Sequence, residues 1–494
     1  MSDLVNYQML INGQWVDAAD GGRFESINPS TGNAWASMPE ATADDVDSAV
    51  KAAERAMYEG PWARMTPTER GKCLRTLADL LADKSEDLGR IETRDTGKMF
   101  TETRWQAKYI AEFFHFYAGC ADKISGQTLP IDKPDMITLT LREPLGVIAA
   151  VVPWNSQLFL VAVKIGPALA AGNTVVLKAS EHASAAMLEF GKLIEEAGFP
   201  DGVVNIVTGH AEPCGRVLTS HPLIQRISFT GGTAAARHVV RNSAENFAQV
   251  SLELGGKSPF IVFDDANIES AVNGSIAGIF GASGQSCVAG SRLYLHNTIA
   301  DEFLKKMLHQ TQAIRMGDPL EEETQMGPLA TYAQIEHIER QVKTAVAEGG
   351  KILTGGNRND TPSTGWYYPP TVIDCPRQDM NIVSTELFGP VLSVLRFDDE
   401  EEVLHLANDS QFGLAAGVFT RDGARALRMT KLLRAGIVWV NTYRVVSPIA
   451  EFGGFKESGY GRESGMQAIY DYTRPKTAWL NISDEPMNNP FVMR

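Results

Sequence analysis

Features that would place a chain in a specialised class are scarce in this sequence. Its 494 residues include only five cysteines, Cys73, Cys120, Cys214, Cys287 and Cys375, which lie far apart and form no CxxC pair. A disulfide framework and a zinc ribbon are therefore disfavoured, and a reducing compartment is expected. No run of 18 apolar residues occurs, and the start, MSDLVNYQML, lacks the basic and apolar regions of a secretion signal. We expect a soluble, cytoplasmic protein with no membrane partner.

Basic residues are also in deficit. There are 45 Lys and Arg against 60 Asp and Glu, a formal net charge of −15, which repels polyanions. Nucleic acid is therefore not expected as a partner. The nine histidines form no HExxH motif and no i, i+4 pair, so we expect no metal site. What remains is an ordinary globular composition, at a length that favours two to four domains.

The middle of the chain alternates short β-branched runs with amphipathic stretches. From Gly146 the runs are GVIAAVV, TVVLKA, VVNIV, RISFT and VSLEL, and helices are predicted over 41–58, 66–92, 183–197 and 332–348. This rhythm predicts an α/β fold with a doubly wound parallel sheet. A second series, from PFIVFDD beyond Gly256 to GIVWVN, predicts a second domain of the same kind. The segment 126–144 alternates polar and apolar residues between prolines, as a protruding hairpin would.

Polar residues and glycines follow the predicted strands of the first series at their carboxyl ends, where open α/β sheets bind ligands. They are Pro153, Trp154 and Asn155; Lys178 and Glu181; Gly209; Gly231 and Gly232 after Phe229; and Glu253, Leu254 and Gly255. We expect them to form one crevice. Gly231 and Gly232 open a helix whose free N–H groups suit a pyrophosphate, although no GxGxxG follows any strand. For each glycine a plain turn remains the alternative.

Cys287 is the cysteine that fits a structural role least well. It stands in GASGQSCVAGSR, whereas a buried structural cysteine normally lies in an apolar run. Small neighbours let backbone N–H groups face the sulfur and a bound oxyanion, as a covalent nucleophile requires, but no histidine is near as a base. Glu253 and Glu386 precede glycine turns. Such residues are usually solvated, yet beside a thiol a carboxylate can activate water against a thioester.

Five motifs occur together over nearly the whole chain. They are PWN at 153–155, LELGGKSP at 252–259, GQSCVAGSR at 284–292, ELFGPV at 386–391, and NTY with FGGFKESGYGRE over 441–463. In this order and spacing the chain resembles the aldehyde dehydrogenase superfamily. The resemblance implies oxidation of an aldehyde to an acid with NAD. Cys287 would form a thiohemiacetal and then a thioester, Asn155 and the Cys287 N–H would hold the oxyanion, and Glu253 would activate water.

The resemblance also assigns residues to the cofactor. Glu386 would bind the nicotinamide ribose beside Phe388, Lys178 and Glu181 the adenosine ribose, and Gly231 with Gly232 the pyrophosphate. The remaining expected cofactor contacts are Pro153, Trp154, Gly209, Phe229, Leu254 and Gly255. A carboxylate at Glu181 repels a 2′-phosphate, so NAD should be preferred over NADP. Gly232 replaces the serine common at its position, and Ala179 replaces the proline that commonly follows the lysine.

The family fold implies three parts. Residues 1–125 and 145–255 would form the NAD-binding domain, 256–460 the catalytic domain, and 126–144 with 473–494 a small β oligomerisation element. A two-stranded hairpin is marginal in water by itself, so we expect it to pair with another subunit in a homodimer or homotetramer.

The substrate is less well defined by the sequence. Positions that resemble the family's substrate tunnel are Ser156, Phe159, Leu160, Val163, Ser286, Val288, Arg444 and Val446. Several of these positions often carry large aromatics in members that oxidise small aliphatic aldehydes, so a wide tunnel and bulky or aromatic aldehydes or semialdehydes are expected. Arg444 would either contact a substrate carboxylate or be solvated.

Two other functions compete with hydrolytic oxidation. A CoA-acylating relative would transfer its thioester to CoA, and retention of Glu253 argues against it. A catalytically silent relative would serve as a binding or structural protein. The presence of Cys287, Asn155, Glu253 and Glu386 together argues against that alternative.

Overall fold

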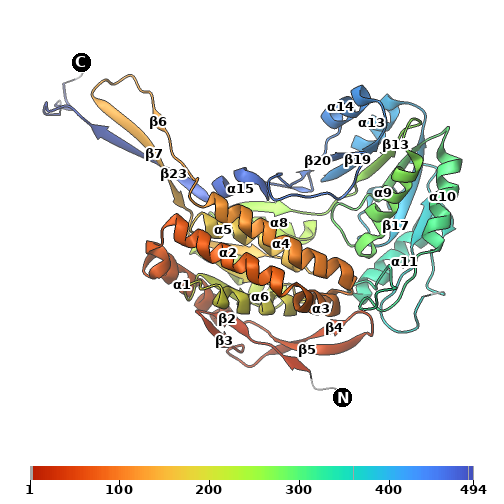
Figure 1. Ribbon diagram of the computed structural model, residues 1–494, viewed down its shortest axis with the longest axis horizontal. Coiled ribbons are helices and arrows are strands. Elements are labelled where there is room, and N and C mark those ends of the chain that lie inside the picture. The colour runs from red at the N-terminus through yellow and green to blue at the C-terminus, as the bar shows by residue number, and fades with distance from the viewer. Residues whose placement is uncertain (1–3, 360, 488, 493–494) are drawn as a thin grey trace.

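The molecule has two lobes and a projecting β arm (Figure 1). A computed structural model describes residues 4–359, 361–487 and 489–492. Residues 1–3 and 360, and residues 488 and 493–494 of the predicted oligomerisation element, lie outside the described residues. Across the described ranges, none of the helices is long and apolar enough to cross a bilayer.

The first lobe is built on an eight-stranded sheet in the order β22-β12-β11-β8-β9-β10-β2-β3. Its strands are β2 (Met9–Ile11), β3 (Gln14–Val16), β8 (Val147–Val151), β9 (Thr174–Lys178), β10 (Val204–Val207), β11 (Ile224–Thr230), β12 (Gln249–Glu253) and β22 (Gly459–Tyr460). The five central strands are parallel, and β2 and β22 pair with them antiparallel. Strand β8 is apolar, β9 has three apolar residues between Thr174 and Lys178, and both strands are almost wholly buried, as expected for strands covered on both faces.

Helices cover both faces of this sheet (Figure 1). They are α1 (Ala43–Tyr58), η1 (Pro61–Arg64), α2 (Pro67–Asp83), α3 (Ser85–Thr96), α4 (Phe100–Cys120), α5 (Gln157–Ala170), α6 (Ala185–Glu196), η2 (Ala211–Gly215), α7 (Arg216–Ser220) and α8 (Thr233–Ser243). Capping boxes at Thr42 and Thr66 start α1 and α2. The helix predicted over 66–92 is divided in two, because the backbone leaves helical geometry at Lys84.

The second lobe contains a seven-stranded sheet in the order β15-β16-β17-β14-β13-β19-β20, parallel except for β15. Its strands are β13 (Pro259–Val262), β14 (Arg292–His296), β15 (Lys351–Thr354), β16 (Thr371–Asp374), β17 (Val391–Phe397), β19 (Ala415–Phe419) and β20 (Ile437–Val440). Its helices are α9 (Ile268–Phe280), η3 (Gly281–Gly284), α10 (Ala300–Gln312), α11 (Tyr332–Ala347), α12 (Asn381–Ser384), α13 (Glu400–Asn408) and α14 (Gly423–Leu432).

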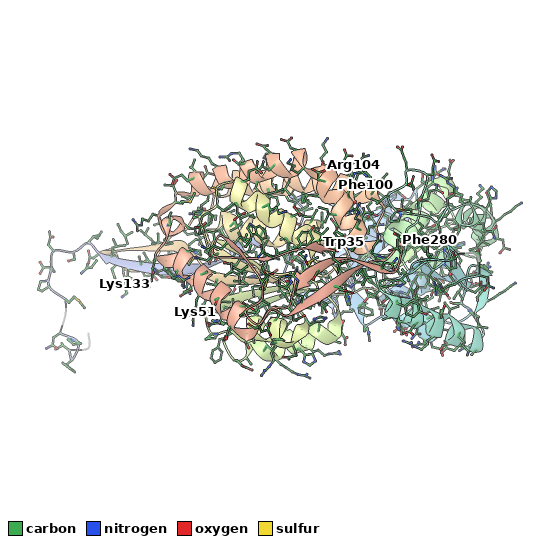
Figure 2. All side chains as sticks on the ribbon, turned by 90° about the horizontal axis from the view of Figure 1, so that it is seen from below. Trp35, Lys51, Phe100, Arg104, Lys133 and Phe280 are labelled. Carbon is green, nitrogen blue, oxygen red and sulfur yellow. The ribbon has the colours of Figure 1, made fainter. Side chains whose placement is uncertain are left out.

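The arm is a three-stranded antiparallel sheet that projects from the first lobe (Figure 1). It consists of β6 (Thr128–Leu129), β7 (Met136–Pro144) and β23 (Thr473–Asn481), which follows α15 (Gly465–Asp471). Lys133, in the connection between β6 and β7, lies far out along it (Figure 2). Trp479 and Leu480 of β23 are exposed.

Two smaller sheets complete the chain. One contains β1 (Val5–Asn6), β4 (Arg23–Asn28) and β5 (Asn33–Pro39), and the other pairs β18 (Phe412–Gly413) with β21 (Phe455–Lys456). The predicted fold class is confirmed: the protein is α/β, with two largely parallel sheets and a small β element. The division into three functional domains stays a proposal, and β22 shows that the chain after residue 256 also contributes to the first sheet.

Candidate active site

A cavity of about 960 Å³ lies at the carboxyl ends of β8, β11 and β12. Further walls come from helices α4 and α5, the loop after η3, the segment after α12 and the loop after β20. The cavity is therefore built by both lobes. Its position matches the edge at which open parallel sheets bind ligands.

Most of the residues selected from the sequence meet in this cavity. It is lined by Asn155, Glu253 and Cys287; by Pro153, Trp154, Gly231, Gly232, Leu254, Gly255, Glu386 and Phe388; and by all eight predicted tunnel positions, Ser156, Phe159, Leu160, Val163, Ser286, Val288, Arg444 and Val446. Lys178, Glu181, Gly209 and Phe229 are not among the lining residues that the structure describes.

Cys287 is partly exposed to the cavity, whereas the other four cysteines are buried. Its backbone carbonyl packs so closely on Gly256 that a Cβ there would come within 2.6 Å of it. Burial, together with the carboxylates of Glu253 and Glu386, raises the pKa of the Cys287 thiol to about 12. The resting sulfur is therefore a neutral thiol, and it needs a proton acceptor before it can attack.

Glu253, the last residue of β12, has a buried side chain that is only 4% exposed. Neither carboxylate oxygen has a hydrogen-bond partner among the residues described. Burial and the neighbouring carboxylate of Glu463 raise the pKa of Glu253 well above its ordinary value. Glu463 is itself paired with the ammonium of Lys164, which also contacts Ser228 Oγ at 3.2 Å. Burial therefore favours the protonated form of Glu253, and its conjugate base is stronger than usual.

Asn155 follows β8 and precedes the first turn of α5. Its Nδ2 donates to the carbonyl of Gln285 at 3.1 Å. The side chain of Gln285 is fixed in turn, because its Oε1 accepts from Ala330 N at 2.8 Å. One amide hydrogen of Asn155 is thus spent on holding the side chain, and the second remains for a ligand in the cavity.

Glu386 is placed against the turn after β12. It accepts a hydrogen bond from Gly256 N at 2.9 Å, and its carboxylate lies so close to Gly255 that a Cβ there would overlap it. Burial raises the pKa of Glu386 to about 7. Phe388 packs edge-on against Trp154, with ring centroids 5.4 Å apart, and the two rings form an aromatic wall of the cavity.

One expectation about the glycines is wrong. The N–H of Gly231 is not free for an anion, because it donates to the Glu253 carbonyl at 3.1 Å and so extends the β11–β12 pairing by one residue. Gly232 is the N-cap of α8, and a Cβ there would meet no atom within 4 Å. A serine would fit at Gly232, so the departure noted in the sequence has no steric cause in the protein itself.

The four predicted residues outside the cavity lie beside it at the same edge of the sheet. Lys178 Nζ is 3.4 Å from Glu181 Oε2, and its stem packs on Gly215. Burial opposes ionisation of Glu181, but Lys178, a backbone hydrogen bond and His182 together outweigh it and lower the pKa of that carboxyl. Gly209 has φ of +148°, in the turn after β10. The Phe229 ring of β11 faces Gly231.

Sequence reasoning missed an entire wall of the cavity. Helix α4 contributes Glu102, Trp105, Gln106 and Tyr109 to it. Trp105 and Tyr109 stack with centroids 4.8 Å apart, so this part of the cavity does have large aromatics. Their spacing of three and four residues places them on one helical face, a signal that was available in the sequence. Glu463 was also missed, because its charge acts on Glu253, a residue remote in the chain, and no local pattern indicates this.

Several residues around the cavity have a left-handed backbone that is unfavourable for a side chain. Ala282 and Ser283 in η3 have φ of 53° and 55°, Phe388 has 53° and Arg444 has 62°. Each such residue costs about 1–3 kcal/mol and persists only where the surroundings hold it in place. Within the described part of the chain, no group of three or more His, Cys, Asp or Glu residues is arranged to hold a metal ion.

Comparison with known proteins gives consistent matches. A profile of the aldehyde dehydrogenase family matches residues 15–478. The chain is 56% identical over 489 residues, 99% of each chain, to the (Z)-2-((N-methylformamido)methylene)-5-hydroxybutyrolactone dehydrogenase of Acinetobacter baylyi.

Solved structures match as well. A putative aldehyde dehydrogenase from Burkholderia cenocepacia is 41% identical, with a TM-score of 0.96 and 99% of both chains covered. The NAD⁺ complex of an aldehyde dehydrogenase from Bacillus cereus is 40% identical, with a TM-score of 0.95 and 97% of both chains covered.

Proposed function

The chain belongs to the aldehyde dehydrogenase family, and from that premise we propose that it oxidises an aldehyde to a carboxylic acid through a thioester on Cys287, with NAD as hydride acceptor. The observation that carries this proposal is the meeting of three groups in one cavity. They are the thiol of Cys287, the amide donor of Asn155 and the carboxyl group of Glu253, which has no hydrogen-bond partner among the described residues. These are the groups that nucleophilic attack, oxyanion stabilisation and hydrolysis require.

The first step is attack of the Cys287 sulfur on the aldehyde carbon. The thiol is neutral at rest, so its proton must leave to solvent as the S–C bond forms. The carbonyl oxygen becomes an oxyanion. The second Nδ2 hydrogen of Asn155 and the Cys287 N–H stabilise it.

The residues present fit a dinucleotide in the cavity. Gly255 leaves room for the Glu386 carboxylate, which suits ribose hydroxyls, and the N-terminus of α8 favours a pyrophosphate. Phe388 and Trp154 provide an apolar wall beside the reacting sulfur. The bound cofactor supplies the acceptor for the hydride that leaves the thiohemiacetal carbon. The collapse of the oxyanion to a carbonyl leaves a thioester on Cys287.

Hydrolysis then depends on Glu253. Its carboxylate takes a proton from water, the water oxygen bonds to the thioester carbon, and the C–S bond breaks to release the acid and the thiolate. The raised pKa of Glu253 makes the ionised form a stronger base at this step. Asn155 again faces the oxyanion, so the same donor serves both halves of the reaction.

We propose that NAD is preferred over NADP. The support is Glu181, whose carboxyl is held ionised by Lys178 at the edge of the sheet beside the cavity. An ionised carboxylate accepts hydrogen bonds from a free 2′-hydroxyl and repels a 2′-phosphate.

For the substrate we propose a bulky aldehyde or semialdehyde. The tunnel wall of Ser156, Leu160 and Val163 is built from small and aliphatic side chains, and α4 adds the stacked rings of Trp105 and Tyr109. The relative from A. baylyi is named for a substituted 5-hydroxybutyrolactone. Opening of a 5-hydroxylactone ring yields an aldehyde, and we extend this kind of substrate to the present chain.

We further propose a homodimer or homotetramer built through the arm, because Trp479 and Leu480 of β23 are too apolar to be left in water. Four of the five cysteine thiols are free and buried, as is typical in a reducing compartment, and we place the reaction in the cytoplasm.

A panel of aliphatic, aromatic and carboxylated aldehydes, each with NAD and with or without CoA, tests the function by NADH formation at 340 nm. One NADH per acid without CoA supports the hydrolytic reaction. Turnover that requires CoA would indicate the acylating alternative, and no turnover with any aldehyde would favour a silent relative. Cys287→Ala should abolish turnover while NAD still binds, as measured by calorimetry.

A further inference from the structure

The wall of the cavity that α4 provides contains a cluster of charges. Glu102 Oε1 lies 3.5 Å from Arg444 Nη2 and 3.7 Å from Lys98 Nζ, so one carboxylate stands between two cations. Burial opposes ionisation of Glu102, but Lys98 and Arg444 outweigh it and lower its pKa. The cluster joins α4 of the first lobe to the loop after β20 in the second. Figure 2 shows the start of α4, marked by Phe100 and Arg104, close to Phe280 at the end of α9 in the second lobe.

Lys98 is 3% exposed and is not among the described residues that line the cavity, yet its charge reaches the cavity through a neighbour. Its ammonium donates to Ser156 Oγ at 3.0 Å and to Gln106 Oε1 at 2.8 Å. Because Lys98 occupies a lone pair of the Ser156 oxygen, the hydroxyl proton of Ser156 is directed elsewhere. Ser156 lines the cavity, so that proton is available to a substrate.

Arg444 is held rigidly on the other side of Glu102. Its Nη1 donates to the carbonyl of Ala277 at 3.1 Å, and its guanidinium fills the space that a side chain at Gly281 would take. Its own backbone is left-handed. These contacts use only part of the five guanidinium hydrogens, and the rest remain for a ligand in the cavity.

The charges of this cluster do not balance. Lys98 and Arg444 contribute two positive charges and Glu102 one negative charge. Glu92 of α3 faces Lys98 from behind, but burial raises the pKa of that carboxyl to about 7, so it offsets the excess only in part at neutral pH. Glu463 is already paired with Lys164. One unit of positive charge at the cavity wall therefore lacks a full counterpart.

We propose that Arg444 and Ser156 form a subsite for a carboxylate on the aldehyde substrate, with Lys98 and Glu102 as positioning residues behind them. This proposal rests on the proposed function and deepens it: the substrate class is an oxo acid, with the aldehyde at Cys287 and the carboxylate at this subsite. A single carboxylate matches the single excess charge and the flat guanidinium fork, whereas a phosphate would bring a second negative charge. The stacked rings of Trp105 and Tyr109 line the same stretch of the cavity.

The test compares two aldehydes of equal length, 4-oxobutanoate and its uncharged amide, 4-oxobutanamide, by kcat/KM with saturating NAD. We expect the wild-type protein to prefer the carboxylate. Arg444→Gln should lower kcat/KM for 4-oxobutanoate about 10- to 100-fold and for the amide by less than about 3-fold, since a charge-assisted hydrogen bond is lost only with the acid. Ser156→Ala should also lower kcat/KM for 4-oxobutanoate relative to that for the amide, but to a smaller extent.

Lys98→Met tests the positioning role. If Lys98 acts through Ser156, the substitution should raise KM for 4-oxobutanoate with little change in kcat, and Ser156→Ala should have no additional effect in the Lys98→Met background. If the role of Lys98 were purely structural, Lys98→Met would lower kcat/KM for both aldehydes alike. The matched controls are Lys108→Met on the exposed face of α4 and Arg421→Gln on the surface. Neither substitution should change kcat/KM for either aldehyde.

The outcomes separate this proposal from the proposed function. If the wild type oxidises both aldehydes with equal kcat/KM, or if Arg444→Gln reduces both equally, the carboxylate subsite is refuted while the dehydrogenase remains. If neither aldehyde yields NADH and no other aldehyde does, the proposed function itself fails. Competitive inhibition by butanoate that weakens in Arg444→Gln supports the subsite, and its absence in the wild type contradicts it.

Discussion

Replacement of Glu253 by glutamine provides a stringent test of the two-stage reaction. The change is nearly isosteric, and because burial raises the pKa of Glu253 and favours its uncharged form, an uncharged amide is a close electrostatic replacement. Neither carboxyl oxygen has a protein partner to lose among the described residues. Folding and NAD binding should therefore change little. Thioester hydrolysis should fall by about 10²- to 10⁴-fold, because the amide cannot take a proton from water. That range corresponds to about 3–5 kcal/mol in the barrier.

The assay is rapid mixing with aldehyde and NAD, followed at 340 nm. Glu253→Gln should release about one NADH per active site in a burst and then turn over slowly. Intact mass measured after the burst should show the acyl group on the protein. Glu245→Gln, an exposed carboxylate after α8, is the matched control and should behave as wild type.

Two results would refute the reasoning. Steady turnover of Glu253→Gln at the native rate would show that another group activates the water. Absence of both burst and acyl-protein would mean that Glu253 is needed before the thioester forms. In that case its main role would be to take the proton of Cys287. The pH dependence of Cys287 alkylation separates these cases: since the Glu253 carboxylate contributes to the raised thiol pKa, that pKa should fall in Glu253→Gln.

Three further substitutions test the cofactor site and the tunnel. Glu181→Ser should shift the ratio of kcat/KM for NADP over NAD upwards by about 10-fold or more, since it removes a charge that repels the 2′-phosphate, and an unchanged ratio would place Glu181 away from the ribose. Gly255→Ala should raise KM for NAD strongly because the new Cβ overlaps the Glu386 carboxylate, whereas Gly423→Ala, with no atom within 4 Å, should be neutral. Val163→Trp should lower kcat/KM for aromatic aldehydes and raise it for acetaldehyde, and equal activity on bulky aldehydes would show that Val163 does not face the substrate.

Residues at or just after the carboxyl ends of strands were the easiest to place from the sequence. Asn155 and Gly232 come shortly after strands, and Glu253 is the last residue of one. A parallel sheet brings the carboxyl ends of its strands to one edge, so their convergence follows from local patterns alone. Cys287 could be selected because its neighbours are unusual for a buried thiol. The sequence did not reveal that the Gly231 N–H is used, because that depends on how far the ladder to β12 extends.

Groups that act through distant partners could not be predicted. Glu463 matters because it lies against Glu253 and Lys164, which are remote in the chain. Lys98 acts through Ser156 across a packed interface. The spacing that places Glu102 on the cavity face of α4 does not reveal its two cationic partners, since an acidic residue in the first turn of a helix usually serves the helix dipole. Which of these charges face one another is decided by tertiary packing.

The residues with left-handed backbone around the cavity lower the stability of the fold while they hold the geometry of the site. Ala282, Ser283, Phe388 and Arg444 each hold a conformation that glycine would adopt without strain. Selection for heat resistance would favour glycine at these positions, yet the same strain fixes the thiol loop, the aromatic wall and the guanidinium in place. All four belong to the second lobe, so the lobe that supplies the nucleophile has stability to gain at these positions. Variants of these residues that melt at higher temperature are the ones expected to lose turnover first.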